Sequence, residues 1–242
     1  MSFFITAFNI ILYQPLLNCL ILLYEYLPGH NFGVAIIVLT VLIKFILYPL
    51  GAKGIQSQKN FSEIQSEIKE IQEKYKNNKE EQTRQLMELY KKKKINPFSG
   101  CLPLLVQLPI LIALYRVFWR GFQAEQMVFL YSFVPDPGVI NTLFLGFIDL
   151  AKPNIILAVL AGILQFFQTK IITFENRNEN REKSSSFSDQ MQKQMQYFMP
   201  IFTVMILFRL PSAIGLYWVV VNLFTIVQQY FIFKKEKIHT VE

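Results

Sequence analysis

The stretch GVAIIVLTVLIKFILYPLGA, residues 33–52, decides the fold class. About 20 mostly apolar residues are enough for one helical passage through a hydrocarbon core about 30 Å thick. One charged residue, Lys44, interrupts this run. A charge near the centre of a membrane helix costs roughly 2.5–3.5 kcal/mol and is therefore a candidate for function. We predict a membrane helix that carries a polar site.

The composition of the whole chain also indicates a membrane protein. Of its 242 residues, 52% are hydrophobic and 17% are charged, whereas an average soluble domain has about 25% charged residues. Two Cys and two His are too few for a disulfide scaffold, a zinc cluster or His-based catalysis. Because this apolar chain still carries a net charge of +7, its positive charge must be concentrated in a few segments.

Four further apolar stretches complete an all-α integral membrane protein with five transmembrane helices. The expected spans are residues 32–52, 98–119, 153–172, 197–210 and 214–233. The fourth span makes only about 21 Å of helix. We therefore expect the bilayer to thin around it.

Residues 3–24 form a sixth apolar stretch, which allows two interpretations. They contain no charge, so hydropathy alone permits a sixth span. However, Pro15 divides the stretch, and Asn9 and Asn18 interrupt its two halves. We favour an amphipathic helix that lies in the membrane interface, within an extracytoplasmic segment 1–31.

The charges in the loops orient the spans. Residues 53–97 contain eleven Lys+Arg and seven Asp+Glu, whereas residues 121–141 contain two Asp+Glu and no Lys or Arg. Basic loops stay in the cytoplasm. The expected cytoplasmic segments are therefore 53–97, 173–196 and the tail 234–242, and the expected extracytoplasmic segments are 1–31 and 120–152.

Residues 53–97 are predicted to form a basic helical hairpin. Apolar residues recur there at spacings of three and four, the pattern of a helix stripe; they are Phe61, Ile64, Ile68, Ile71 and Tyr75. Asn78 is placed to cap a second helix, about 79–94, with Glu81 as its capping-box partner. Its charged surface is either simply solvated or binds anionic lipid or ribosomal RNA. The polar residues 175–190 are expected to be flexible.

Polar residues within the spans share one depth. Counted from the cytoplasmic end of each predicted helix, they lie in its inner half, whereas the outer half is apolar. They are Thr40, Lys44, Gln107, Gln165, Gln168, Asn222 and Gln228. No Asp or Glu stands within the five spans, so we expect water around the Lys44 ammonium group. We predict a hydrated cavity that opens to the cytoplasm. The simpler explanations are a lysine that reaches the inner interface and amides that join neighbouring helices.

Short strings along the chain carry a resemblance to a known family. They include Tyr13-Gln-Pro-Leu16, Tyr48-Pro-Leu50, Ile95-Asn-Pro97, Gly100-Cys-Leu-Pro103, Gln107-Leu-Pro-Ile110, Met199-Pro200, Leu216-Tyr-Trp218 and Gln228-Gln229. In this order, and with a charged hairpin after the first of five spans, the chain from Tyr13 to Lys235 resembles the YidC/Oxa/Alb family of membrane protein insertases. It is similar to the short bacterial form.

The resemblance implies a positively charged groove among the five helices, open to the cytoplasm and sideways to lipid. The groove would hold the hydrophilic tail of a nascent membrane protein while the apolar segment passes into the bilayer, without ATP hydrolysis by the protein itself. The resemblance implies no enzyme activity, metal or cofactor, and it implies location in the inner (plasma) membrane of a bacterium. The expected groove residues are Lys44, Thr40, Gln107, Gln165, Gln168, Tyr217, Trp218 and Asn222.

The resemblance also implies partners for the basic segments. In this family the hairpin and the tail are linked to the ribosome, the targeting receptor and the Sec translocon. The corresponding residues are Lys91, Lys92, Lys93, Lys94, Lys234, Lys235 and Lys237. The chain departs from the family pattern at Lys44, where most bacterial members have Arg, and at Ala213, where Gly is usual. At position 44 the charge stays, but the bidentate fork of an arginine is lost.

Two other function classes fit the sequence less well. A transporter or channel would need polar residues in the outer halves of the spans, and many transporters also show inverted repeats. An intramembrane enzyme would need paired carboxylates, or a His beside a nucleophile, within the spans. The spans offer little polarity in their outer halves and show no inverted repeat, and they contain neither paired carboxylates nor a His beside a nucleophile.

Overall fold

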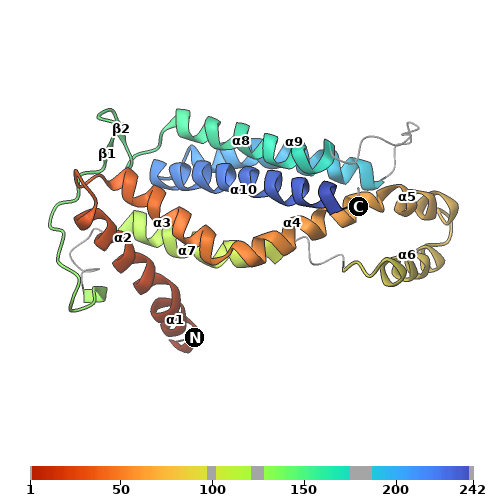
Figure 1. The fold of residues 1–242 in the computed structure, drawn as a ribbon, viewed down its shortest axis with the longest axis horizontal. Coiled ribbons are helices and arrows are strands. Elements are labelled where there is room, and N and C mark those ends of the chain that lie inside the picture. Colours follow the sequence, from red (N-terminus) through yellow and green to blue (C-terminus); the bar gives the residue numbers. More distant parts are fainter. Residues whose placement is uncertain (1, 97–101, 121–127, 175–186, 240–242) are drawn as a thin grey trace. The chain divides into compact units, whose positions relative to one another are not determined.

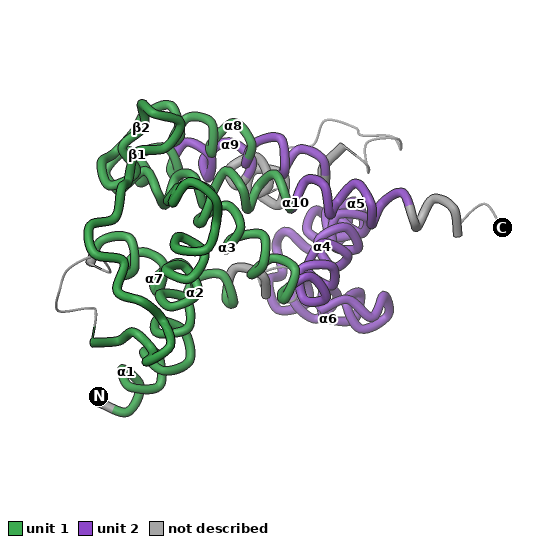
Figure 2. The backbone as a smooth tube through the Cα atoms, turned by 60° about the vertical axis from the view of Figure 1, so that its left-hand side comes forward, with its two compact units in different colours: residues 1–47, 104–164, 202–224 green, residues 48–103, 165–201, 225–242 purple. Residues whose placement is uncertain are grey.

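The computed structural model describes residues 2–96, 102–120, 128–174 and 187–239. The described chain is mostly helical, with a two-stranded sheet (Figure 1). It divides into two compact units (Figure 2). Unit 1 comprises Met1–Leu47, Leu104–Leu164 and Phe202–Phe224, and unit 2 comprises Tyr48–Pro103, Gln165–Ile201 and Thr225–Glu242.

The elements are numbered in chain order (Figure 1). The first are α1 (Ser2–Phe8), the π-helical turn η1 (Asn9–Tyr13), α2 (Gln14–Tyr26), α3 (Phe32–Ile46), α4 (Tyr48–Glu63), α5 (Gln65–Lys74) and α6 (Lys79–Lys93). The others are α7 (Leu102–Arg120), β1 (Leu143–Phe144), β2 (Ile148–Asp149), α8 (Ile155–Phe174), α9 (Phe187–Leu207) and α10 (Ser212–His239). The helical content agrees with the predicted all-α class. The sequence predicts only a loop at 120–152, whereas the structure has the antiparallel pair β1 and β2 there.

Several helices are apolar enough to lie in a membrane. Within the described ranges, Phe3–Tyr26 and Ser212–Lys234 are long and apolar enough to cross one, and α3 with α4 adds a third if the broken pair counts as one span. Shorter apolar helices cover Leu105–Trp119, Ile155–Ile171 and Gln196–Leu207. Because the shorter helices fall below the length of a full span, the presence of five spans stays a prediction.

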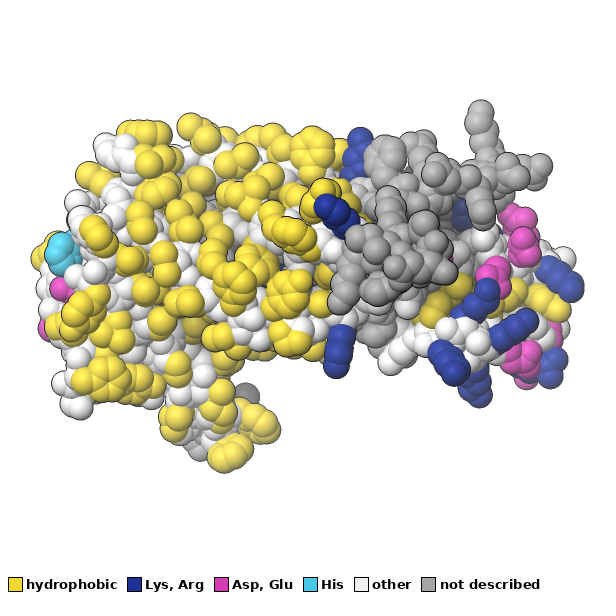
Figure 3. Space-filling model, viewed as in Figure 1, with side chains coloured by type: hydrophobic (Ala, Val, Ile, Leu, Met, Phe, Trp, Pro, Cys, Tyr) yellow, Lys and Arg dark blue, Asp and Glu magenta, His cyan; other side chains and the backbone are white. Residues whose placement is uncertain are grey.

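Unit 1 is apolar both inside and outside. Its core contains side chains from α2, α3, α7, α8 and α10, such as Leu20, Ile36 and Ile214. Hydrophobic side chains such as Phe45 and Ile156 also stand exposed on its surface, and Figure 3 shows how widely such side chains spread over this part of the protein. An apolar surface of this extent is not stable in water. It is the surface expected of helices that face lipid.

The N-terminal apolar stretch is helical through Pro15. The amide of Gln14 donates to the carbonyl of Asn9, which makes the wider π-helical turn η1 directly before the proline. A proline lacks the amide hydrogen for a regular helical bond and clashes with the preceding turn, and a π-bulge is one of the known ways to relieve this. Pro15 therefore interrupts the regular hydrogen bonding without ending the helix, which remains compatible with either an interfacial or a spanning segment.

Polar side chains join the N-terminal helix to the segment between α7 and α8 in unit 1. Asn18 is buried; its Nδ2 donates to the carbonyl of Phe129 (3.0 Å), and its Oδ1 accepts the amide of Tyr131 (2.7 Å). The hydroxyl of Tyr24 accepts the amide of Asn141 (3.1 Å). The polar residues that interrupt this apolar stretch are therefore used for tertiary contacts.

Helix α3 ends earlier than the predicted first span. It stops at Ile46, and α4 starts at Tyr48 after a single non-helical residue, Leu47. Pro49 explains the break, because a proline lacks the amide that would bond the carbonyl four residues earlier, here that of Phe45, and its ring clashes with that carbonyl. Lys44 consequently lies in the last turn of α3.

The basic hairpin of unit 2 forms much as predicted. Ile64, Ile68 and Leu89 are buried between its helices, and Asn78 Oδ1 accepts the amide of Glu81 (3.1 Å) at the start of α6. The reciprocal half of the predicted capping box is wrong, because the amide of Asn78 donates to the carbonyl of Tyr75. Lys, Arg, Asp and Glu side chains gather over α5 and α6 in Figure 3.

The carboxylate of Glu81 turns instead along its own helix. It accepts Arg84 Nη2 (2.8 Å) and Gln85 Nε2 (2.9 Å). The Arg84 hydrogen bond, followed by that of Gln85, lowers the pKa of the Glu81 carboxyl. Of the polar stretch 175–190, which the sequence predicts to be flexible, residues 175–186 lie outside the described residues. Residues 187–190 are instead helical and form the first turn of α9.

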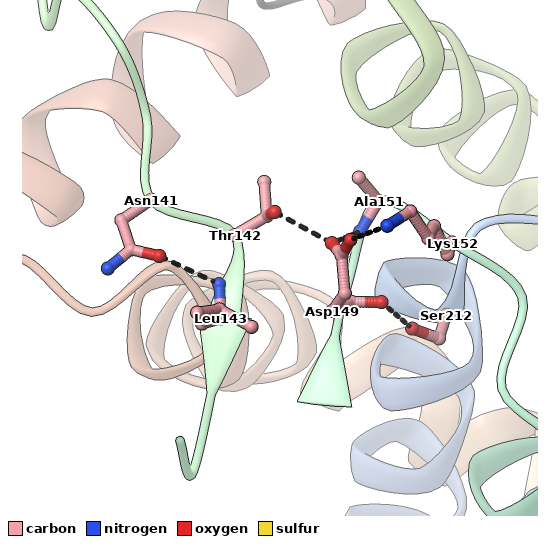
Figure 4. Close-up of polar contacts among 7 residues, drawn as sticks. All are labelled: Asn141, Thr142, Leu143, Asp149, Ala151, Lys152 and Ser212. Carbon is pink, nitrogen blue, oxygen red and sulfur yellow. Dashed lines mark hydrogen bonds and ion pairs between the residues drawn. The ribbon is translucent and has the colours of Figure 1, made fainter. Parts of the chain in front are cut away.

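A polar network fixes the sheet of β1 and β2 to the start of α10 (Figure 4). The Asp149 carboxylate accepts the Thr142 hydroxyl (2.8 Å) and the Ala151 amide (3.0 Å), and it pairs with Lys152 Nζ (3.0 Å). Ser212 Oγ donates to the carbonyl of Asp149 (3.0 Å). Helix N-termini leave amides without partners in the helix. Here the amide of Ser212 donates a hydrogen bond to the carbonyl of Lys152 (2.9 Å).

The Asp149 network predicts a pH-dependent contribution to stability. The Thr142 hydrogen bond, then that of Lys152, lowers the pKa of the Asp149 carboxyl. A lowered folded-state pKa stabilises the fold above the unfolded value of about 3.9, and this contribution disappears as the pH falls through the folded value. Because the Lys152 side chain is largely exposed, screening limits the ion pair to about 0.2–1 kcal/mol.

The measurement is thermal unfolding of the protein and of Asp149→Asn in detergent across the acidic range. We expect the variant to be less stable at neutral pH, and the difference to shrink toward pH 3. Asp136→Asn is the matched control, because Asp136 lies exposed in the same loop and accepts the Gly138 amide. A difference between wild type and Asp149→Asn that is independent of pH would contradict the role of the carboxylate charge.

Candidate functional site

Lys44 lies half-buried on α3, against an aromatic side chain of α10. Its Nζ is 5.6 Å from the centroid of the Phe224 ring. The same ring makes an edge contact with Phe45, at a centroid distance of 5.2 Å. A lysine ammonium within about 6 Å of an aromatic face is attracted by the ring quadrupole, and more strongly when water is excluded. The ring of Phe224 therefore helps to position the Lys44 cation.

The predicted neighbour Thr40 uses its hydroxyl within its own helix. Thr40 is buried, and its Oγ1 donates to the carbonyl of Ile36 (2.6 Å). Serine and threonine often make this bond in membrane helices. The contact satisfies the hydroxyl locally, so this hydrogen bond gives Thr40 a structural role.

Gln107 and Tyr217 join α7 to α10. Gln107 Nε2 donates to the hydroxyl of Tyr217, and Tyr217 is almost fully buried while Gln107 stays half-buried. Tyr217 and Phe224 stand about two helical turns apart, so they lie on the same side of α10. This side of α10 therefore contacts Lys44 through Phe224 and Gln107 through Tyr217.

Asn222 has a different surrounding. It is buried, and its Nδ2 donates to the carbonyl of Ala161 on α8 (3.0 Å). This bond is of the kind that joins neighbouring membrane helices, the simpler explanation for an amide in a span. Trp218 is half-buried against the core of unit 1. The six predicted groove residues Lys44, Thr40, Gln107, Tyr217, Trp218 and Asn222 thus belong to one compact unit.

Two predicted groove residues belong to unit 2. Gln165 and Gln168 are half-buried on α8, and the carbonyl of Gln165 accepts the Thr169 hydroxyl (3.0 Å). Gln228, a further polar residue noted in the sequence, is buried in unit 2, and its Nε2 donates to the carbonyl of Tyr48 (3.0 Å). The amide of Gln228 therefore joins α10 to the first residue of α4, next to Pro49.

Sequence reasoning missed two residues of unit 1. Phe224 carries no polar group, so no pattern marks it as the neighbour of a cation. Arg116 does carry a signal, because it is a charge within the predicted second span. Its Nη1 donates to Asn9 Oδ1 (2.8 Å), and its guanidinium carbon lies 4.7 Å from the Tyr13 ring centroid. Arg116 thereby joins α7 to the π-helical turn.

The basic residues predicted as partner contacts lie in unit 2. Lys91–Lys94 are exposed at the end of α6 and just after it, and Lys93 Nζ pairs with the Glu67 carboxylate of α5 (2.7 Å). Lys234 is exposed on α10, whereas the side chains of Lys235 and Lys237 lie outside the described part. Among the described residues, no group of three or more His, Cys, Asp or Glu side chains could hold a metal ion.

Comparison with known proteins agrees with the resemblance found in the sequence. Residues 22–239 match the model of the 60Kd inner membrane protein family. A protein of Fusobacterium nucleatum named membrane protein insertase YidC is 39% identical over 205 residues, which are 85% of this chain and 87% of the relative. A protein of the same name from Clostridium tetani is 39% identical over 213 residues, 88% of this chain and 86% of the relative.

A longer relative matches over part of its length. The protein of that name from Geobacter metallireducens is 34% identical over 223 residues, which are 91% of this chain and 36% of the relative. The match to the family model and these identities over most of the chain confirm the predicted kinship with the YidC insertases. The chain belongs to the 60Kd inner membrane protein family.

Proposed function

We propose that this protein is a membrane protein insertase of the bacterial inner membrane, and that it acts without hydrolysing ATP. Its relatives carry the name membrane protein insertase. The observation that carries the proposal is the half-buried ammonium group of Lys44, held beside Phe224 in a unit whose surface is otherwise largely apolar. The substrates would be nascent membrane proteins with a short hydrophilic tail.

Lys44 would lower the cost of bringing that tail into the membrane. Two opposite charges 4 Å apart attract each other by about 4 kcal/mol at an effective dielectric constant of 20. A carboxylate of the tail that reaches Lys44 would recover part of its lost hydration in this way. Gln107 and Tyr217 offer further polar atoms on the same side of α10. The apolar segment that follows would pass directly into lipid along the exposed apolar side chains of unit 1.

The remaining predicted features extend this proposal. Five spans, an extracytoplasmic N-terminus and a cytoplasmic C-terminus would open the groove to the cytoplasm, where the tail arrives. Gln165 and Gln168 would add polar groups at its cytoplasmic part. The exposed lysines at 91–94 and in the tail 234–242 would contact anionic partners, which for this family implies the ribosome, the targeting receptor, the Sec translocon or lipid headgroups.

The test of the proposed function is complementation. A bacterium depleted of its own insertase receives this protein, and insertion of a small single-span substrate is followed by protease accessibility of its translocated tail. We expect insertion well above the empty-vector control. Purified protein in vesicles, without nucleotide, should also raise insertion of the same substrate. If the protein is present in the membrane in normal amount and insertion stays at the vector level, the proposal is wrong.

A further inference from the structure

The tip of the β1–β2 hairpin has an unusual residue at a strained position. The amide of Phe147 donates to the carbonyl of Phe144 (3.3 Å), which closes a turn with Leu145 and Gly146 at its centre. Both central residues have positive φ, 54° for Leu145 and 80° for Gly146. Such turns favour Asn-Gly or Asp-Gly, because few side chains tolerate the left-handed region. A leucine at this place destabilises the turn relative to asparagine. The conformation of the turn therefore does not explain why leucine occupies this position.

The tip of the hairpin is apolar on both of its faces, whereas the half-buried Asp149 stands opposite Leu143 at its base. Phe144 and Ile148 face the core of unit 1, where Ile148 is 5% exposed. On the other side Leu143, Leu145 and Phe147 are 48%, 63% and 71% exposed. Successive side chains of a strand point to opposite faces, and a hairpin at a water-exposed surface normally has polar residues on its outer face. Water is therefore a poor surrounding for this outer face.

The hairpin is fixed at the ends of apolar helices. Phe144 rests on Gly33, the second residue of α3, so closely that an added Cβ would lie 2.6 Å from the Phe144 Cγ. The carbonyl of Leu150 accepts the amide of Ala213 at the start of α10 (3.0 Å). Only a few residues after β2, α8 begins with the exposed side chains of Ile155 and Ile156. The hairpin thus lies level with the N-terminal ends of α3, α8 and α10, where helices that cross a bilayer reach its surface.

We propose that the tip formed by Leu143, Leu145 and Phe147 inserts into the outer leaflet and anchors the ends of α3 and α10 at the membrane surface. The occupant of its apolar face is lipid, since the exposed apolar side chains at the start of α8 follow only a few residues after β2. The exposed ammonium group of Lys152 pairs with Asp149 next to the sheet, where a lysine reaches the polar headgroup region. Insertion of its side chain into lipid explains why leucine occupies the strained turn position.

The test places a nitroxide spin label at the tip, in the full chain with Cys19 and Cys101 replaced by serine. The labelled variants are Phe147→Cys and, as the aqueous control, Asn77→Cys in the turn between α5 and α6, which is exposed. The protein is reconstituted in vesicles of phosphatidylethanolamine and phosphatidylglycerol. Collision with oxygen, which dissolves in lipid, and with a water-soluble nickel complex is measured by power saturation.

The two collision rates separate three surroundings of the tip. We expect the label at 147 to collide with oxygen and to meet the nickel complex at least about tenfold less than the label at 77 does. Access of the nickel complex equal to that at 77 would place the tip in water and overturn the proposal. Protection from both reagents would mean that protein covers the tip, which would overturn it as well.

A second variant distinguishes anchoring from folding. Leu145→Asn suits the turn better, so the hairpin should stay folded while its apolar tip is lost. We expect this variant to raise the access of the nickel complex to the label at 147, with thermal stability in detergent unchanged or higher. Unchanged access would overturn the role of Leu145 as an anchor. These measurements require no substrate, so their outcome is independent of the proposed insertase function.

Discussion

Replacing Lys44 with alanine is expected to reduce the insertion of a substrate with an acidic tail by at least about tenfold. A factor of ten corresponds to about 1.4 kcal/mol, which is a minor part of the attraction of about 4 kcal/mol for a carboxylate 4 Å from a half-buried ammonium group. The loss should depend on the charge of the tail. A substrate whose tail carries no carboxylate should insert into membranes with Lys44→Ala much as it does with wild type.

Three variants isolate the charge at position 44. Lys44→Arg keeps the cation and should retain most of the activity, whereas Lys44→Met keeps a similar length and should behave like alanine. Lys170→Met removes another half-buried lysine, one that lies over the Phe166 ring in unit 2, and should leave insertion near the wild-type level. Equal insertion of the acidic substrate by wild type and by Lys44→Ala, at equal amounts in the membrane, would show that this cation is not used.

Replacing Gly33 with alanine is expected to lower the free energy of unfolding by about 1–3 kcal/mol, the usual range for an overpacked site. Helix propensity alone predicts the opposite sign, because alanine is better than glycine in a helix by about 1 kcal/mol. The new methyl group would meet the Cγ of Phe144 at 2.6 Å. Since that atom lies at the base of an aromatic ring, the whole ring would have to move. Thermal unfolding in detergent measures the change.

The cause of the Gly33 effect is checked by removing the ring. Phe144→Ala leaves room for the methyl group, so Gly33→Ala should cost little when it is added to this variant. Gly215→Ala is a milder control, because its Cβ would stand 3.3 Å from the Cβ of Leu157. A Gly33→Ala protein as stable as wild type would mean that the β1–β2 hairpin does not pack firmly against α3.

Local features of the fold could be predicted from the sequence. Helix α6 begins where Asn78 caps it and ends within one residue of the prediction, because the cap and the lysine-rich end are set by neighbours in the chain. The stripe at Ile64 and Ile68 predicts the buried side of the hairpin for the same reason. The end of α3 at Ile46 could also be predicted from local sequence, because Pro49 follows three residues later. The long apolar run 33–52 instead suggests one uninterrupted helix.

Features that depend on distant residues could not be predicted. The two-residue strands carry no alternating pattern long enough to recognise, and their turn has leucine where asparagine is favoured. Polar residues in the spans are found easily, but their distant partners are not: Asn222 binds a backbone carbonyl of another helix, 61 residues away in the chain. The ring beside Lys44 belongs to Phe224, one of 23 phenylalanines in the chain, and nothing in the sequence distinguishes it.

The contact between Arg116 and the π-helical turn makes two distant positions interdependent. A guanidinium in an apolar unit is acceptable while Asn9 accepts its hydrogen bond and Tyr13 covers its face. Asn9 and Tyr13 precede the segment 22–239 that matches the family model, whereas Arg116 lies inside it. A chimera that keeps this protein's α7 but takes its first helix from a relative would contain Arg116 without its hydrogen-bond acceptor Asn9. The two positions should therefore be exchanged together, and natural variants should change them as a pair.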